Sequence, residues 1–442
     1  MTAPQPAGRD RTAPGPAGGP GHDTPRPPAR TVDLDGFRFP LGTETLGLSW
    51  HPRERRPDTL NLKSCELQHP WSDQLVAGEL AALPLAETIA YPFQDRVLEA
   101  LDTYHGLDSG HVLLTAGSDN GIGLVVDALV RPAGRLLLQE PAFEAWRHYA
   151  GLRRVQVTGV PGLTGTPPTA DPAPLLAALR ATPAPAVAAV TNPGSPSGLL
   201  YPPETMRRFA ETARERGHLL VIDEAYGDFV HTSHAPLVTE FPNVIVVHSY
   251  SKAFALAGVR IAALLVHPEL REHLGRFRPE NAVGAPGVAL LERLAPQRER
   301  WREIWRDVRA VRREFTDRVL STHTGWHVLQ PGANFATFWS PDPATADAAR
   351  DQLAAHRVRI RSLSDLPGLA GCFRVSLADR PAMERVARLL DAVTDRDRPP
   401  AIPPAGSANP PASSATPVTP VTSVTVPAAP PGDVPHRPEP PY

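Results

Sequence analysis

The chain has 442 residues, with 45 basic and 47 acidic side chains and a formal net charge of −2. Because the charge is balanced and no basic stripe with interleaved aromatic residues appears, we expect no nucleic-acid partner. No stretch approaches the roughly 20 apolar residues of a membrane helix, and no apolar run follows positive charges near residue 1, so we expect a soluble, cytoplasmic protein without a membrane partner.

Both ends of the chain are dominated by Pro, Ala, Gly, Ser and Thr. Residues 1–30 and 397–442 contain too little apolar surface to offset the entropy lost on ordering, so we predict two disordered tails. The remainder is long enough for one large and one smaller domain. Cys65 and Cys372 are too few and too isolated for a disulfide framework or a zinc site, and we expect no metal.

The first part of the body has no clear period. Short apolar pieces such as 37–41 and 46–50 follow one another irregularly, and we interpret residues 31–90 as an N-terminal arm, which packs on a partner, together with part of the small domain. Helical spacing of apolar residues then runs from Val97 to Tyr104. Tyr91 and the proline after it mark the entry to this helix, since proline is tolerated in a first turn.

Strands and helices alternate between residues 112 and 266. An apolar stretch at 122–129 predicts a helix, and short apolar runs predict strands at 112–115, 136–139, 187–190, 219–222 and 244–247. This alternation predicts an α/β fold with a mainly parallel sheet covered on both faces, in a large domain of residues 91–285. Ligands bind beyond the carboxyl ends of such strands. The residues at or just past those ends are Asn192, Asp223, Tyr226 and Lys252.

A smaller C-terminal α/β domain is predicted over residues 286–396. Apolar residues at helical spacing indicate a long helix over 298–319, and we interpret the arginines and glutamates on its other side as a solvated face. Strand-like runs at 335–339 and 373–377 and a helical pattern at 383–393 complete this domain.

Lys252 is one of only two lysines among the 45 basic residues, the other being Lys63. A lysine amine can lose its proton and attack a carbonyl, whereas an arginine guanidinium cannot. The hydroxyls of Ser249 and Ser251 precede it and Arg260 follows, which together suit a phosphorylated aldehyde. The alternative is a surface lysine that begins a helix.

Two further positions are compatible with ligand binding. Ser118 and Asp119 follow a predicted strand and begin a helix, where free backbone N–H groups bind anions, although such a pair is more often only a helix cap. Phe143 follows the strand at 136–139 and is either a core residue or an aromatic lid over a planar ring.

Taken together, three motifs resemble the fold-type I aminotransferases that use pyridoxal 5'-phosphate, most closely the histidinol-phosphate aminotransferase group. The motifs are Ser249 to Arg260, Asn192 to Gly198 and Asp223 to Tyr226, and the resemblance covers roughly residues 60–395. It implies the aspartate aminotransferase-like fold, a large cofactor-binding domain with a smaller C-terminal domain, and an enzyme that acts as a homodimer with shared active sites.

The resemblance also implies roles for individual residues. Lys252 would carry the cofactor as an imine and move the Cα proton, and Asp223 would face the pyridine nitrogen. The remaining cofactor contacts would be Asn192 and Tyr226 at the ring oxygen, Phe143 stacked on the ring, Ser118, Asp119, Ser249, Ser251 and Arg260 at the phosphate, and Tyr91 at the phosphate of the neighbouring subunit. Arg374 would bind the anionic group of the substrate.

The sequence departs from the family pattern where substrates are selected. The family's Asn-Glu-Asn-Pro signature is absent near residue 60, and Glu280 stands where an aromatic residue is frequent; His248 also replaces a common arginine. If Glu280 faces the pocket, its charge disfavours a phosphorylated substrate, so we expect an ordinary amino acid with its carboxylate on Arg374 over histidinol phosphate.

The main hypothesis is therefore an aminotransferase that moves an amino group between a 2-oxo acid and an amino acid or an amino alcohol phosphate. A decarboxylase or lyase similar to threonine-phosphate decarboxylase shares every cofactor residue and stays open as an alternative. A cofactor-binding regulatory module is a third possibility, but it needs a DNA-binding helix pair, which the Pro-rich and Gly-rich first 30 residues cannot form.

Overall fold

The computed structural model describes residues 30–34, 37–41 and 58–393, and the chain forms two compact units, Met1–Pro52 and Arg53–Tyr442. In the first unit, β1 (Arg30–Leu34) pairs antiparallel with β2 (Phe37–Leu41) in a hairpin. Arg30, the last residue of the predicted N-terminal tail, begins β1. The rest of both predicted tails and the apolar piece 46–50 lie outside the described residues, so what we expect of them stays a prediction.

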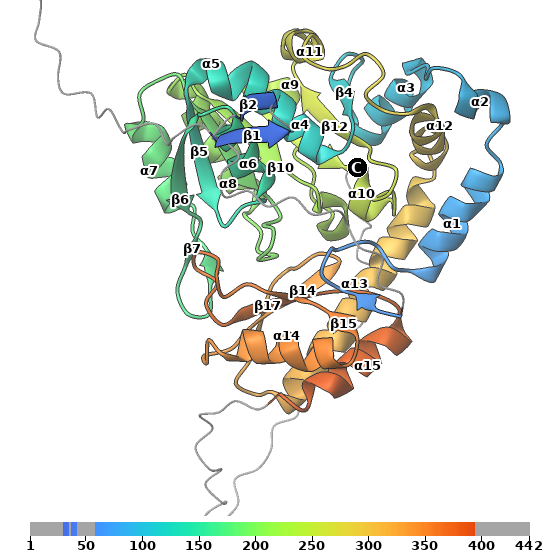
Figure 1. The fold of residues 1–442 in the computed structure, drawn as a ribbon, viewed down its shortest axis with the longest axis vertical. Helices are drawn as coiled ribbons and strands as arrows, with labels where there is room; N and C mark the ends of the chain where they lie inside the picture. The colour runs from blue at the N-terminus through green and yellow to red at the C-terminus, as the bar shows by residue number, and fades with distance from the viewer. Residues whose placement is uncertain (1–29, 35–36, 42–57, 394–442) are drawn as a thin grey trace, which may run out of the picture. The chain divides into compact units, whose positions relative to one another are not determined.

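A seven-stranded sheet forms the centre of the second unit (Figure 1). Across the sheet the strands are β4 (Val112–Thr115), β12 (Ala262–Val266), β11 (Val244–Ser249), β10 (Leu219–Asp223), β9 (Val187–Thr191), β5 (Arg135–Glu140) and β6 (Gln156–Pro161). All run parallel except β12, which is antiparallel to both neighbours. The predicted mainly parallel α/β sheet is confirmed.

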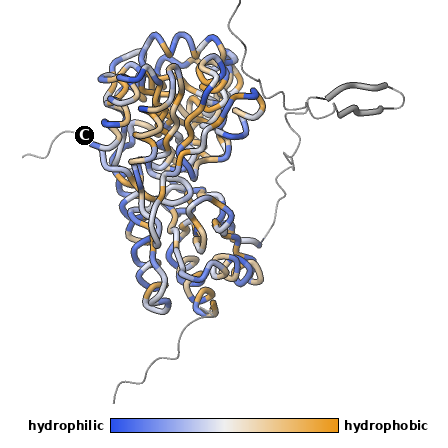
Figure 2. Tube along the Cα trace, turned by 90° about the vertical axis from the view of Figure 1, so that its left-hand side faces the viewer, coloured by the Kyte–Doolittle hydropathy of each residue, from blue (hydrophilic) through white to orange (hydrophobic). Residues whose placement is uncertain are grey.

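Both faces of the interior strands are buried, which explains why those strands are continuous apolar runs rather than alternating ones, unlike the largely exposed edge strand β6. Along β11, Val244 and Val246 belong to one hydrophobic cluster, and Ile245 and Val247 belong to the cluster on the opposite face. Successive side chains of a strand point to opposite faces, so every residue of the run is in a core. Figure 2 shows the resulting concentration of hydrophobic residues on the interior strands.

Helices cover both faces. On one face lie α4 (Ser118–Val125), its π-helical continuation η1 (Val126–Val130), and α6 (Ala145–Leu152). On the other lie α3 (Asp95–His105), α7 (Ala173–Ala181), α8 (Pro203–Glu215) and α12 (Ala285–Leu294). The other helices of this region are α1 (Pro70–Ala81), α2 (Leu85–Ile89), α5 (Arg131–Ala133), η2 (Gly227–Val230), α9 (Leu237–Glu240), α10 (Tyr250–Ala253) and α11 (Pro268–Gly275).

A second, antiparallel sheet has four strands, β13 (His327–Leu329), β14 (Phe335–Trp339), β17 (Cys372–Ser376) and β16 (Arg361–Ser362). It packs with α14 (Thr345–Ala355) and α15 (Arg380–Leu390), and the long α13 (Arg298–Thr322) runs between the regions of the two sheets (Figure 1). Two small pairs complete the fold, β3 (Leu60–Asn61) with β15 (Val358–Arg359) and β7 (Leu163–Thr164) with β8 (Thr169–Ala170).

The helix after β4 begins at Ser118, as expected for the Ser118–Asp119 pair, because Gly117 with a φ of 84° lets the chain turn directly into it. One detail differs from the sequence prediction: the charged side of α13 is not all solvated, because Arg312 is buried. No described helix is long and apolar enough to cross a membrane.

Candidate active site

Polar residues stand where the central parallel strands end. Thr191, Asp223 and Ser249 are the last residues of β9, β10 and β11. Lys252 follows three residues after Ser249, in α10. Because carboxyl ends of parallel strands meet at one edge of the sheet, these side chains gather where α/β sheets bind ligands.

A cavity of about 590 Å³ opens at this edge. Its wall brings together most of the residues that the sequence singled out, although they are spread over more than 250 positions of the chain. They are Ser118, Asp119, Phe143, Asp223, Tyr226, Ser249, Ser251, Lys252, Arg260 and Arg374.

Three other predicted site residues lie outside the lining. Asn192 is fully buried, and its side-chain amide is bonded to the backbone of Tyr201 and lies 2.9 Å from His234 Nε2. Tyr91 is 81% exposed. Glu280 is exposed in the turn before α12, so the argument that its charge selects the substrate has no support from the geometry.

One end of the cavity is built for an anion. Gly117 precedes α4, and a Cβ there would lie 2.6 Å from a guanidinium nitrogen of Arg260. That guanidinium donates to Asp119 Oδ2 at 3.2 Å, beside the free N–H groups of the first turn of α4. Arg260 itself has a φ of 59°, a strained conformation of the kind found at functional sites.

Asp223, also in the cavity lining, is a buried carboxylate with few partners. Among the described residues, only the backbone N–H of Ala225 donates to it, at 3.2 Å. Burial raises the pKa of Asp223 to about 7, with Asp119 and Glu224 adding to the rise. A carboxylate in this setting would be stabilised by a cationic N–H group in the cavity.

Comparisons with known proteins decide the family. The model of aminotransferase class I and II matches residues 60–393 of this chain. The chain belongs to this family. Membership confirms the predicted fold class, the assignment as an enzyme of the transaminase type, and pyridoxal 5'-phosphate as the cofactor.

Individual relatives of this aminotransferase are consistent with that assignment. A histidinol-phosphate aminotransferase of Deinococcus radiodurans is 29% identical over 325 residues, which cover 73% of this chain and 83% of the relative. The structure of a Sinorhizobium meliloti histidinol-phosphate aminotransferase in complex with pyridoxal-5'-phosphate aligns with a TM-score of 0.65 and 23% identity over 76% of this chain and 90% of that one. An L-threonine-O-3-phosphate decarboxylase of Porphyromonas gingivalis shares the fold, with a TM-score of 0.62 and 18% identity over 75% of this chain and 98% of that one.

The residues present fit the cofactor. An anion cradle at α4 suits the phosphate, and the under-partnered Asp223 suits a protonated ring nitrogen. In this aminotransferase the Lys252 amine donates to the Ser64 carbonyl at 2.7 Å. Burial lowers the pKa of Lys252, and Arg374 and Arg260 add to the decrease, which increases the share of neutral, nucleophilic amine.

Two arginines stand side by side at the end of the cavity formed by the four-stranded sheet. Arg374 on β17 is directly opposite Arg361 on β16, and both line the cavity. A terminal nitrogen of Arg374 donates to the Lys63 carbonyl at 2.8 Å, and its guanidinium lies 5.1 Å from the centre of the Phe335 ring. Its Nε is buried without a hydrogen-bond partner among the described residues.

Several lining residues were not predicted as site residues. They are Lys63, Ser64, Glu66, Glu144, Thr191, Ser195, Ala225, Ala257 and Arg361. Lys63 had one signal, since it is the only other lysine, whereas Arg361 alternates with apolar residues like its neighbours Arg357 and Arg359 and carried none. Segment 63–66 has no chemical pattern of its own that indicates a site, and the departure from the family signature near residue 60 was the signal for it; long-range bonds to Lys252, Arg374, Ser376 and Asn334 hold it at the cavity.

Proposed function

We propose that this aminotransferase takes its amino group from a donor with a phosphate end, an amino alcohol phosphate of the histidinol phosphate kind, and exchanges it with a 2-oxo acid. The observation that carries this proposal is the pairing of Arg361 with Arg374 across β16 and β17. Like charges directly opposite each other in a sheet repel, so the pair favours an anion bound between them. A phosphate dianion satisfies two guanidiniums better than a carboxylate does.

The charge of the surrounding wall supports the same donor. Lys63, whose carbonyl accepts from Arg374, adds to a lining with five basic side chains and four carboxylates, the latter being Glu66, Asp119, Glu144 and Asp223. The carboxylate of a 2-oxo acid would use Arg374 as well, because donor and acceptor occupy one site in turn. The relatives named histidinol-phosphate aminotransferases agree with a phosphorylated donor.

Individual residues would then act as follows. When bound, pyridoxal 5'-phosphate supplies an electron sink for the substrate Cα. Lys252 would hold the cofactor and move the proton at Cα, since its amine lies in the cavity with a lowered pKa. Asp223 would keep the ring nitrogen protonated, Tyr226 and Phe143 would contact the ring, and Ser118, Asp119, Ser249, Ser251 and Arg260 would hold the phosphate.

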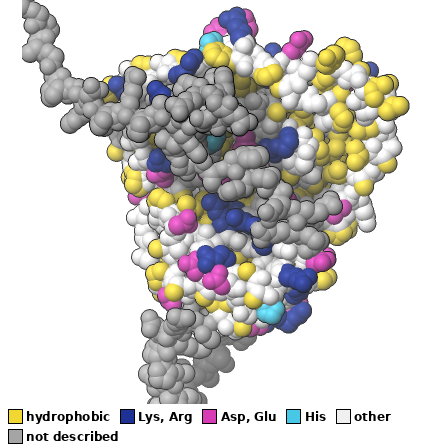
Figure 3. All heavy atoms as spheres, viewed as in Figure 1, with side chains coloured by type: hydrophobic (Ala, Val, Ile, Leu, Met, Phe, Trp, Pro, Cys, Tyr) yellow, Lys and Arg dark blue, Asp and Glu magenta, His cyan; other side chains and the backbone are white. Residues whose placement is uncertain are grey.

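A second copy of the chain would complete the enzyme. Large apolar side chains stand exposed on and around α1 and α2, and they include Leu80, Leu85, Ile89, Tyr91 and Phe93, the last at 84% exposure. Figure 3 shows apolar side chains gathered over the region where α2, α3 and α12 lie. Such a patch indicates a protein interface, and Tyr91 on it would reach the phosphate of the partner copy.

The domain boundaries at 31–90, 91–285 and 286–396 and the cytoplasmic location also remain parts of this proposal. Limited proteolysis would test the boundaries, because cleavage between domains should spare each core.

Kinetics with matched donors test the substrate. Histidinol phosphate should be used with a higher kcat/KM than histidinol, histidine, aspartate or glutamate, with 2-oxoglutarate as acceptor and the product identified. Arg361→Gln should lower kcat/KM for the phosphate donor by about tenfold and change that for carboxylate donors less. Equal use of histidinol and its phosphate would disprove the proposed donor.

Covalent labelling tests the site independently. The wild type should be yellow with pyridoxal 5'-phosphate and should retain the cofactor on Lys252 after borohydride reduction. Lys252→Ala should lose both the link and turnover, and a link retained through Lys63 would refute the assignment of Lys252.

A further inference from the structure

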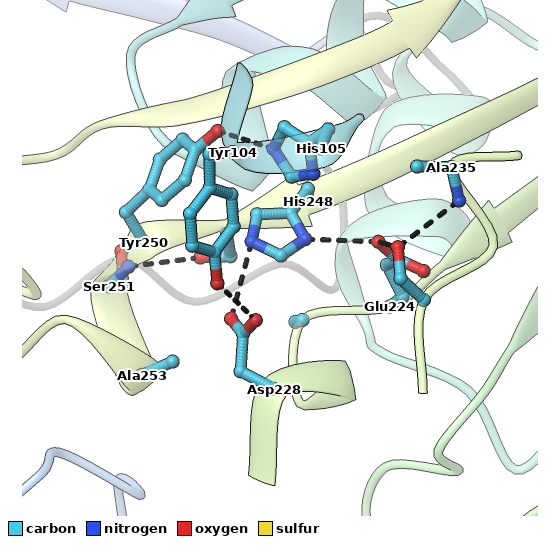
Figure 4. A network of polar contacts seen from close by, with 12 residues as sticks. Tyr104, His105, Glu224, Asp228, Ala235, His248, Tyr250, Ser251 and Ala253 are labelled. Carbon is cyan, nitrogen blue, oxygen red and sulfur yellow. Dashed lines mark hydrogen bonds and ion pairs between the residues drawn. The ribbon is translucent and has the colours of Figure 1, made fainter. Parts of the chain in front are cut away.

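A buried polar network lies behind the proposed cofactor site (Figure 4). At its centre is His248, the residue before the end of β11, which is 2% exposed. Its Nδ1 lies 3.0 Å from Glu224 Oε1, and its Nε2 lies 3.3 Å from Asp228 Oδ2. The second contact is an ion pair at an angle unfavourable for a directed hydrogen bond.

The two carboxylates require a cation between them. Glu224 is fully buried and also accepts from the backbone N–H of His234 at 2.7 Å, while Asp228 accepts from the Tyr104 hydroxyl at 2.5 Å. Burial by itself lowers the pKa of His248, but Asp228 and Glu224 together outweigh it and raise the pKa to about 10. His248 is therefore an imidazolium at neutral pH.

His248 supplies the charge between Glu224 and Asp228, whereas the other cation of the network, Arg298, lies over the Tyr104 ring, 5.2 Å from its centre. His105 on α3 lies 4.6 Å from the His248 ring, and burial, His248 and Arg298 lower its pKa, so it is neutral. Glu224 and Asp228, both after β10, face His248 directly, and the rings of Tyr104 and His105 on α3 and of Tyr250 on α10 lie 4.6 to 6.2 Å from its ring. Beyond them, Arg298 on α13 acts on Tyr104 and His105, Asp102 on α3 acts on Tyr250, and His234 in the loop before α9 contacts Glu224. Burial raises the pKa of Tyr104 and of Tyr250, so neither hydroxyl loses its proton near neutral pH.

The network and the cavity lie on opposite faces of the same two strand ends. Asp223 on β10 pairs with Val247 on β11, and Glu224 and His248 are the next residues of the two chains. Alternation along a strand points Asp223 and Ser249 to the cavity and turns Glu224 and His248 to the face with α3. The ion pair thus joins the segment that carries Asp223 and Tyr226 to the segment that carries Ser249 and Lys252.

We propose that His248 is a positioning residue, whose imidazolium, held by Glu224 and Asp228, fixes the spacing between the Asp223 segment and the Lys252 segment across the cofactor. This inference rests on the proposed roles of Asp223 and Lys252. Groups that bind one ligand from two segments tolerate little change in the spacing between those segments, so loss of the central charge should weaken cofactor binding as well as folding.

The sign of the pH dependence follows from the raised pKa of His248. Its contribution is complete below about pH 6.5, the value for an exposed histidine, and is lost as pH rises through about 10. An arginine at this position would stay charged over the whole range.

Binding of pyridoxal 5'-phosphate to cofactor-free protein tests the proposal, with melting temperatures measured alongside. At pH 7.5, His248→Gln should bind the cofactor about tenfold more weakly than wild type, and His248→Arg should restore most of the affinity. Between pH 8 and pH 10.5, wild type should lose about threefold in affinity relative to His248→Arg.

His218→Gln is the matched control. His218 is also 2% exposed and precedes β10 at its other end, where its Nε2 lies 3.0 Å from the Leu179 carbonyl. This variant should lower the melting temperature and leave cofactor affinity unchanged. If His248→Arg does not fold, Glu224→Gln replaces it, because loss of one carboxylate should move the decline in affinity to lower pH.

The inference would be overturned if His248→Gln bound the cofactor as tightly as wild type does. It would also be overturned if the cofactor affinity of wild type and of His248→Arg declined in parallel with rising pH, or if the decline in Glu224→Gln occurred at the same pH as in wild type. Failure of the proposed function would give a different result from failure of this inference, because wild type itself would then not hold pyridoxal 5'-phosphate on Lys252.

Discussion

Two buried arginines touch the same phenylalanine and differ in what satisfies them. Arg312 of α13 donates from Nε to the Phe335 carbonyl at 3.1 Å and from its terminal nitrogens to Gln330 and the Leu329 carbonyl. Arg374 of β17 lies over the Phe335 ring, and its buried Nε has no partner among the described residues. One guanidinium is bonded to its own chain, and the other faces a cavity.

This difference in hydrogen bonding distinguishes Arg312, a structural cation, from Arg374, a cation available to a ligand. Burial lowers the pKa of Arg312 to about 10, so it stays charged at neutral pH, and its bonds to carbonyls compensate for lost water. Gly332 has no side chain because a Cβ there would overlap the Arg312 guanidinium. The chain is thus shaped around Arg312, whereas Arg374 makes one bond to the Lys63 carbonyl and keeps its remaining donors for an anion.

The largest expected effect is on the structural arginine. Arg312→Met leaves the carbonyls of Phe335 and Leu329 buried without their donor, so we expect the free energy of unfolding to fall by about 3 kcal/mol. Urea denaturation measures this, and kcat of the folded enzyme should stay within about twofold of wild type. Unchanged stability with lost turnover would remove the distinction between the two arginines.

The opposite pattern is expected at the cavity. Arg374→Gln removes a charge-assisted hydrogen bond to the substrate anion, worth about 1.5 to 3 kcal/mol, and should lower kcat/KM by roughly tenfold to a hundredfold. Its free energy of unfolding should change by less than about 1 kcal/mol, since few of its donors are bonded within the protein. A large loss of stability would place Arg374 in the same class as Arg312.

Asp223 extends the comparison to a carboxylate and to pH. Burial raises its pKa to about 7, so its charge disfavours the folded, cofactor-free protein increasingly as pH rises from about 4 to about 7. Asp223→Asn should therefore stabilise that protein by about 1 to 2 kcal/mol at pH 8, with little effect at pH 4, while turnover falls. Melting curves at both pH values check this, and a gain that is equal at both would show that the carboxylate charge is not its source.

The smallest effect is expected for an arginine with complete partners at the surface. Arg380 is half-exposed and bonds to Asp307 at 2.8 Å and Glu314 at 2.9 Å. Solvent and salt screen such pairs, so Arg380→Gln should cost at most about 1 kcal/mol, and less in 1 M salt. A cost as large as that of Arg312→Met would mean that burial is not what separates these arginines.

Local sequence patterns predicted most elements of the central sheet, because their strands are buried on both faces and therefore form continuous apolar runs. The strand at 244–247 and the polar residues that follow it were predicted in this way, and Lys252 was singled out because lysine is rare in this chain. The same reasoning placed Arg312 on a solvated face, since a single arginine among many on one helix carries no signal of its burial.

Sequence patterns did not predict the direction in which individual side chains point. Asn192 follows a strand end as expected, yet its amide is bonded to Tyr201 rather than lining the cavity. Glu280, which was expected to influence substrate choice if it faced the pocket, is exposed and outside the cavity lining, whereas Arg361 and Lys63 line the cavity. Periodicity gives the position of a residue along an element, but it does not say which bonds its side chain forms with distant segments.

The sequence by itself determined the parallel sheet, the lysine able to form an imine, and the residues at the strand ends, because these depend on hydrophobic pattern and residue chemistry over short distances. Only the tertiary structure decided that Arg361 stands beside Arg374, that segment 63–66 reaches Lys252, and that His248 is held between two carboxylates. Those contacts join positions far apart in the chain, and they are selected by the packing of the whole body rather than by any local preference.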